Sequence, residues 1–196
     1  MEEIKKVVGV NIESGSVIPL EKGKIPPQAV DLEEAVLGAM LIDKKGVDEV
    51  IDILQGDAFY KTSHQFIFES IFELFEASEP IDLLTVSNNL KKKGKLEVAG
   101  GTPYLVQLTQ KVASSAHIEF HARIILQKFI QRSLIKISSE IIENSYKDSI
   151  DVFDLLDEAE SKLYDVTQGN IKKSSETAQS LVIQAKKRIE DISKRK

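Results

Sequence analysis

The chain has 196 residues, of which 42% are hydrophobic, and it contains no cysteine. This composition can support a buried core. It excludes a disordered polypeptide, a disulfide scaffold and thiolate metal sites, and it fits a reducing cytoplasm. The net charge of −5 is uneven, because residues 172–196 carry eight basic and three acidic side chains (+5) and the preceding 171 residues therefore carry −10. A body this acidic is a poor candidate for strong electrostatic binding to a phosphate backbone. The basic tail could contact nucleic acid or, equally, an acidic protein surface.

Residues 1–24 show no sustained apolar period and contain three glycines and a proline. They are predicted to form a mobile arm. The start does not have the pattern of a signal peptide. No stretch approaches the roughly 18 apolar residues of a membrane span, so no membrane contact is expected.

A proline pair, Pro26 and Pro27, precedes the first predicted helix. Asp31 is predicted as its N-cap and Glu34 as the reciprocal member of a capping box. The apolar residues that follow form a wide stripe suited to a core.

Three more short helices are expected before a glycine pair. One ends at Gly56, and the next starts near Ser63. Five of the eight phenylalanines lie between residues 59 and 75, so this helix is predicted to form the middle of the core. Asp82 is predicted to cap a further helix that Gly94 ends. In "GGTPYLVQL", Thr102 is predicted as the N-cap of a fifth helix, with Pro103 at its first position.

The second half of the chain has a different character. Residues 117–147 contain neither glycine nor proline, and a second apolar stripe follows over residues 152–166 after a short turn. Two long helices joined by a short turn form an antiparallel hairpin. Four of its apolar side chains are candidate partner-docking residues: Ile125, Phe129, Leu155 and Leu163.

A linker and an amphipathic helix are expected at the end of the chain. An apolar stripe after a linker requires a surface elsewhere, in another chain or domain. The candidate docking residues on this helix are Leu181, Val182, Ala185, Ile189 and Ile192.

No segment of real length alternates with period two, so the chain is predicted to be all-α. The expected organisation is an arm (1–24), a helical domain (25–168) and a linker with an amphipathic helix (169–196). The helical domain would consist of a head (26–112) and the hairpin (114–168).

Catalytic motifs are absent. The sequence has no G-x-x-x-x-G-K-[ST], G-x-G-x-x-G or G-x-S-x-G. His117 and His121 have the spacing of two zinc ligands, but a third ligand is not indicated, so we interpret them as ordinary helix residues. His64 is interpreted as a capping or packing residue. No catalytic, cofactor or metal residue is therefore assigned.

Two charged features have an ordinary interpretation and a functional one. The lysines around Lys91 to Lys95 loosely resemble part of a winged helix-turn-helix, but lysines also complement the dipole at a solvated helix end. The acid pairs Glu33–Glu34 and Asp157–Glu158 are expected on solvated faces, because acid–base catalysis needs carboxylates in contrasting environments.

Five stretches occur in an order and spacing that identify a family. These stretches are "IPPQAVDLEEAVLGAMLID", "DAFY" with "HQFIFESIFEL", "PIDLLTVSNNLKKKGKLEVAGGTPYLVQL", "ASSAHIEFHARIILQKFIQRSLI" and "DVFDLLDEAESKLYDV". Together they resemble the amino-terminal region of the bacterial replicative DNA helicases, the DnaB family, over residues 25 to about 168. His117 departs from the family, which more usually has Asn there.

The resemblance implies a non-catalytic part of a hexameric helicase. In that family the ATPase is a RecA-like domain after the linker, and the sequence stops at Lys196 before any of it. ATP and Mg²⁺ would belong to that domain, as would most DNA contact. The implied partners are other copies of the chain (dimer, trimer of dimers, hexamer), primase, and the neighbouring subunit's motor domain through the linker helix.

Two alternatives stay open. One is a helix-turn-helix DNA-binding regulator. The other is a free-standing α-helical adaptor whose gene encodes no motor domain.

Overall fold

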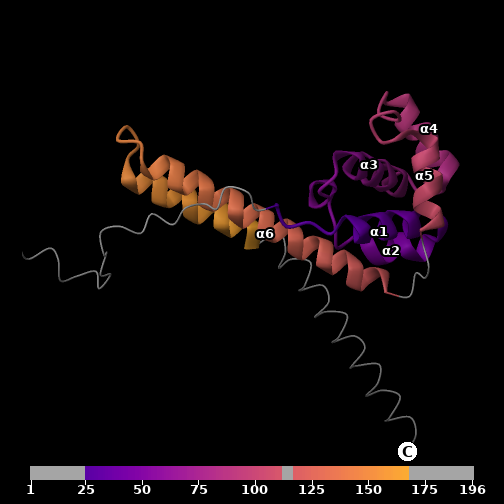
Figure 1. Cartoon of the computed structure of the whole chain (residues 1–196), viewed down its shortest axis with the longest axis horizontal. Helices are drawn as coiled ribbons and strands as arrows, with labels where there is room; N and C mark the ends of the chain where they lie inside the picture. Colours follow the sequence, from indigo (N-terminus) through magenta and orange to yellow (C-terminus); the bar gives the residue numbers. More distant parts are fainter. Residues whose placement is uncertain (1–24, 112–116, 168–196) are drawn as a thin grey trace, which may run out of the picture.

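A computed structural model of the chain describes residues 25–111 and 117–167 (Figure 1). Every regular element in these two ranges is helical, which confirms the predicted all-α class. The predicted arm, the linker and the amphipathic helix lie outside the described residues. The elements are α1 (Val30–Ile42), α2 (Lys44–Val50), the 3-10 helix η2 (Gly56–Ala58), α3 (Thr62–Glu76), α4 (Leu83–Lys92), α5 (Gly101–Gln110), α6 (Ile118–Ser145) and a helix over residues 152–167.

Helix α1 is the centre of the compact group of helices. It contacts α2, α3, α5 and α6, and Val36, Leu37 and Met40 have no exposed surface. A helix that is hydrophobic on nearly all sides is stable only when it is surrounded. The phenylalanine-rich helix α3 contributes Ile67, Phe68, Ile71 and Leu74 to the core, as predicted, but α1 rather than α3 is its centre, and Phe72 and Phe75 of α3 are each 37% exposed.

The helix starts were predicted with mixed success. The capping box at Asp31 and Glu34 is wrong: α1 begins at Val30 without any side-chain cap. The cap at Asp82 is confirmed, because its carboxylate accepts hydrogen bonds from the amides of Leu84 (2.8 Å) and Thr85 (2.9 Å). The hydroxyl of Thr85 accepts a bond from the amide of Asp82 in return. A cap whose partners lie within three residues can be recognised from local sequence.

Helix α5 begins earlier than predicted. Gly100, with a φ of 100°, occupies the N-cap position, and α5 starts at Gly101, so Thr102 is not the cap and Pro103 is not the first residue. A Cβ at Gly100 would lie 2.8 Å from Cβ of Tyr104. Only glycine adopts this backbone conformation without strain and leaves room for Tyr104.

Helix α6 has two halves with different neighbours. In the first half, Ile118, Ala122 and Ile125 are buried in the core formed by the compact group. The second half extends away from that group and runs beside the helix over residues 152–167 (Figure 1). An ion pair of 2.8 Å from Lys162 to Glu140 joins the two helices, and Ile137 is only 7% exposed. The described residues therefore form a head and a projecting helical hairpin.

Candidate functional site

A buried polar network lies between α1, α3 and α5. Glu33 of α1 is 1% exposed and His64 of α3 is fully buried. An oxygen of Glu33 lies 2.6 Å from Nδ1 of His64, and the other accepts a 2.7 Å bond from the amide of Tyr60. The other imidazole nitrogen lies 2.7 Å from the hydroxyl of Tyr104. Burying these groups is tolerable only because each one has a partner.

Glu34 extends this network toward the surface. It is 5% exposed and accepts hydrogen bonds from Tyr104 (3.2 Å), Lys61 (3.3 Å) and Lys111. Although burial acts in the opposite direction, the bonds from Lys111 and Lys61 hold the pKa of Glu34 below its ordinary 4.5. Burial, together with the charge of Glu34, raises the pKa of the Tyr104 phenol. Tyr104 is therefore a hydrogen-bond donor rather than a base at neutral pH.

The network corrects two interpretations of the sequence. Glu33 and Glu34 were expected on a solvated face, yet both are buried and bound. His64 does pack in the core, as expected, but it does so as the middle of a polar chain. Because these carboxylates are occupied by protein partners, they serve to fix α1, α3 and α5 relative to one another.

The other histidines do not lie in a metal-like cluster. His117 is exposed at the start of α6, and His121 is half-buried one turn later. Within residues 25–111 and 117–167, no group of three or more His, Asp or Glu side chains is arranged to hold a metal ion. The same ranges contain no helix long and apolar enough to cross a membrane.

The lysines after α4 are largely engaged by α3. Lys93 pairs with Glu73, and Lys95 pairs with Glu69 at 3.5 Å. The ammonium group of Lys95 also lies 4.1 Å from the centre of the Phe66 ring. These contacts tie the α4–α5 connection to α3. Lysines held by neighbouring carboxylates are poorly placed to bind phosphates.

The candidate docking residues of the hairpin fall into two groups. Ile125 is 1% exposed, and Phe129 packs against the same head core. Both therefore contribute to the packing of α6 on the head within this chain. Leu155 is half-buried and Leu163 is 43% exposed, so these two are accessible on the hairpin. The five candidates on the linker helix, Leu181, Val182, Ala185, Ile189 and Ile192, lie outside the described residues.

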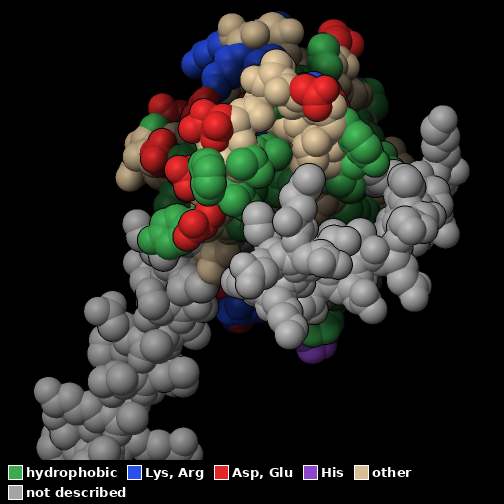
Figure 2. Space-filling view, turned by 90° about the vertical axis from the view of Figure 1, so that its left-hand side faces the viewer, with side chains coloured by type: hydrophobic (Ala, Val, Ile, Leu, Met, Phe, Trp, Pro, Cys, Tyr) green, Lys and Arg blue, Asp and Glu red, His purple; other side chains and the backbone are tan. Residues whose placement is uncertain are grey.

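The hairpin exposes more apolar side chains than the candidates that the sequence suggested. Beyond the half of α6 that packs on the head, the large ones are Leu134, Ile135, Ile142, Tyr146, Val152, Phe153, Leu156, Leu163 and Tyr164. In the view from the hairpin end, hydrophobic side chains lie exposed between acidic ones (Figure 2). Exposed apolar side chains that gather on one surface are typical of a contact with another protein. Periodicity alone could not separate these residues from core residues, because both kinds recur at helical spacing.

Comparison with known proteins decides the family. The model of the DnaB-like helicase N terminal domain matches residues 25–127. The chain belongs to the DnaB-like helicase N-terminal domain family. It is 41% identical over 172 residues to replicative DNA helicase DnaB of Rhodothermus marinus, and 35% identical over 174 residues to that of Geobacillus stearothermophilus. Each alignment covers 88% of this chain but only 18% and 38% of the relatives, so the chain spans well under half of their length.

Two solved structures share the DnaB-type fold. The crystal structure of the N-terminal domain of DnaB helicase from Mycobacterium tuberculosis is 32% identical, with a TM-score of 0.68. It covers 72% of this chain and 99% of that one. A second structure, of a DnaB-like replicative helicase and its interactions with primase, is 27% identical with a TM-score of 0.58, covering 70% of this chain and 31% of that one.

Proposed function

We propose that this chain is the collar and linker of a hexameric replicative DNA helicase. It organises the subunits and docks primase, and it does not itself catalyse a reaction. The collar would comprise residues 25–168, between an arm (1–24) and a linker with an amphipathic helix (169–196). ATP-driven unwinding, with its ATP, Mg²⁺ and most DNA contacts, belongs to a motor domain of the kind found in the whole helicase.

The observation that carries this proposal is the exposed apolar surface of the hairpin. Leu156 is 60% exposed and Phe153 is 72% exposed, on a hairpin that projects away from the head. A second hairpin laid against the first would bury these side chains in a four-helix arrangement. We propose that such pairing gives dimers and that three dimers form the ring of the whole protein.

Primase docking is supported by a relative rather than by a surface of this chain. The solved DnaB-like helicase at 27% identity is described together with its interactions with primase. The test is isothermal titration of this chain with the primase of the same organism. Saturable binding, with ATP hydrolysis at background level, is expected. No binding, or ATP turnover by the 196-residue chain, would contradict the proposal.

The linker helix is a separate part of the proposal. Leu181→Asp with Ile189→Asp should prevent ring assembly of a full-length helicase and leave the unfolding midpoint of the head unchanged. The reason is that a carboxylate on the apolar stripe cannot be buried against a neighbouring subunit. Size-exclusion chromatography and thermal unfolding measure the two effects. If the head unfolds at lower temperature, the helix belongs to its core.

The two alternatives make different predictions. A DNA-binding regulator would bind duplex DNA sequence-selectively, and its affinity for that DNA would fall little at high salt. The pairing of Lys93 and Lys95 with α3 carboxylates favours the helicase over this regulator. A free-standing adaptor would lack a G-x-x-x-x-G-K-[ST] sequence in its gene after Lys196, so reading that gene separates it from the helicase.

A further inference from the structure

The outer side of α3 carries two hollows that the proposed collar function does not use. One has a volume of about 560 Å³ and is lined by Lys44, Val47, Phe75, Glu76, Glu79 and Ile81. The other has a volume of about 320 Å³, and Leu54, Gly56, Phe68 and Phe72 line it. We call the two together the α3 groove.

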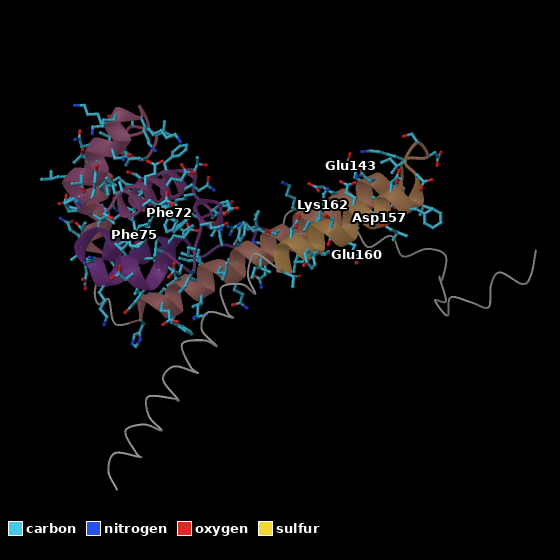
Figure 3. The ribbon with its side chains drawn as sticks, turned by 180° about the vertical axis from the view of Figure 1, so that it is seen from behind. Phe72, Phe75, Glu143, Asp157, Glu160 and Lys162 are labelled. Atoms are coloured by element: carbon cyan, nitrogen blue, oxygen red, sulfur yellow. The ribbon has the colours of Figure 1, made fainter. Side chains whose placement is uncertain are left out.

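The spacing of residues on α3 places these hollows end to end. Phe68, Phe72 and Phe75 recur at i, i+4 and i+7, so they follow one side of α3, and Glu79 lies just beyond the helix, which ends at Glu76. From Phe68 to Phe75 this side of the helix extends about 10 Å at 1.5 Å per residue. Figure 3 shows Phe72 and Phe75 close together on the head, at the opposite end of the molecule from the hairpin tip.

Two aromatic side chains in the groove are partly exposed to solvent. Phe72 and Phe75 are each 37% exposed, although both belong to a helix whose inner face is fully buried. Aromatic side chains that are partly exposed in a concave surface are typical anchors of protein–protein contacts. The described part of the chain has no strand, so a partner cannot add to a sheet edge, and a helix in a groove is the mode that fits.

The charge around the α3 groove indicates which charged side chains a helix bound there would carry. Four glutamates border it: Glu69, Glu73, Glu76 and Glu79. The first two are paired with Lys95 and Lys93. Glu76 and Glu79 have no ion-pair partner among the described residues, and Lys44 is the one cation that lines the hollows in those ranges. The free charge at the Phe75 end is therefore negative.

We propose that the α3 groove binds an amphipathic helix of another protein, with basic residues beside its apolar anchors. Phe68, which lines one hollow, and Phe75, which lines the other, are seven residues or about 10 Å apart along α3, which is two helical turns. The partner helix therefore inserts apolar side chains about seven residues apart, and its lysines or arginines face Glu76 and Glu79. This site is separate from the hairpin and adds a second docking surface to the proposed collar, so its test does not depend on self-association.

The probe is a synthetic helical peptide with leucines about seven residues apart and flanking lysines, labelled for fluorescence anisotropy. A second peptide has glutamates in place of the lysines. The full chain should bind the lysine peptide at least about tenfold more tightly than the glutamate peptide. Equal affinity, or no binding of either, would overturn the proposal.

Paired charge reversals locate the binding site. Glu76→Lys with Glu79→Lys should weaken binding of the lysine peptide about tenfold or more and improve binding of the glutamate peptide. The matched control is Asp157→Lys with Glu160→Lys, which makes the same charge change on exposed hairpin residues (Figure 3). It should leave both affinities unchanged. If both double variants weaken binding of the lysine peptide equally, the effect comes from the net charge of the chain, and the assignment of the binding site to the α3 groove is wrong.

Two further measurements complete the test. One asks whether the aromatic side chains of the α3 groove contribute to binding, and the other asks whether the bound helix comes from another protein or from a second copy of this chain. Phe75→Ala should weaken the lysine peptide severalfold, while circular dichroism checks that the head stays folded. A peptide of residues 175–194 of this chain has similar chemistry. If that peptide displaces the probe from the groove at lower concentration than the unlabelled probe itself, the occupant is a second copy of this chain, and the assignment to another protein is wrong.

Discussion

At the scale of single residues, the chain depends on a few buried polar groups. His64→Leu should be among the most destabilising substitutions, because it leaves Glu33, 1% exposed, without the imidazole 2.6 Å away. Leaving a buried polar group without its hydrogen-bond partner typically costs about 1–3 kcal/mol, and more where that group is charged. Urea unfolding measures this loss. The control is Glu119→Gln, which removes an exposed pair with Arg123 on α6 and should cost under about 0.5 kcal/mol. Similar losses in both would contradict the role of the network.

Glu34 makes the stability of the head depend on pH. Its pKa in the folded chain lies below the ordinary 4.5. Its contribution is therefore complete above about pH 4.5 and disappears as the pH falls through the lowered pKa. Lys111→Met removes one of the bonds that lower this pKa, so the variant should lose less stability than the wild type between pH 6 and pH 3. Urea unfolding at several pH values tests this, and parallel losses would contradict it.

At the scale of elements, Arg132 ties α6 to two segments of the head. Its guanidinium donates to the carbonyl oxygens of Pro27 (2.9 Å) and Ala58 (2.6 Å) and lies 5.7 Å from the centre of the Tyr60 ring. Partial burial lowers the pKa of Arg132 without neutralising it. These bonds hold the residues before α1 and the η2 turn against the long helix.

Arg132→Met retains the aliphatic stem and removes both hydrogen bonds. It should lower the free energy of unfolding by about 2–3 kcal/mol, because each bond from a charged donor contributes about 1.5–3 kcal/mol before relaxation. Amide exchange in η2 should become faster. Arg123→Met, also on α6 but in an exposed pair, serves as the control and should change neither quantity appreciably. If the amides of η2 exchange as slowly in the Arg132 variant as in the wild type, the hydrogen bonds of Arg132 do not hold η2 in place.

The elements differ in how much the sequence reveals. The cap at Asp82 and the long helix α6 could be predicted, because their signals lie within three residues or within one uninterrupted apolar period. The burial of Glu33 and Glu34 could not, because their partners Tyr60, Lys61, His64 and Lys111 lie 27 to 77 residues further along the chain. A carboxylate looks the same in sequence whether water or a distant lysine satisfies it.

The candidate docking residues show the same limit. Ile125 and Leu163 both follow an apolar period in the hairpin, yet one is 1% and the other 43% exposed. The difference arises because the head covers only the first half of α6. The signal that could have separated them is the length of α6, since this helix of about 40 Å extends beyond the head (Figure 1).

At the scale of the whole molecule, the described residues form a compact head and a projecting hairpin that exposes apolar side chains. The head has its own core and a satisfied polar network, whereas the hairpin exposes leucine, isoleucine and aromatic side chains. This division is what the proposed role as a collar between subunits requires. The family membership of residues 25–127 agrees with it.

Sedimentation equilibrium of the wild-type chain and of Leu156→Lys with Leu163→Lys tests the central claim most directly. Both leucines are exposed on the hairpin, so the substitutions should leave the head folded. The wild type should form dimers or larger species, and the variant should have at least about a tenfold weaker association constant, because two lysines would have to be buried at the hairpin contact. A wild-type chain that stays monomeric at high concentration, or a variant that associates equally well, would contradict pairing through the hairpin.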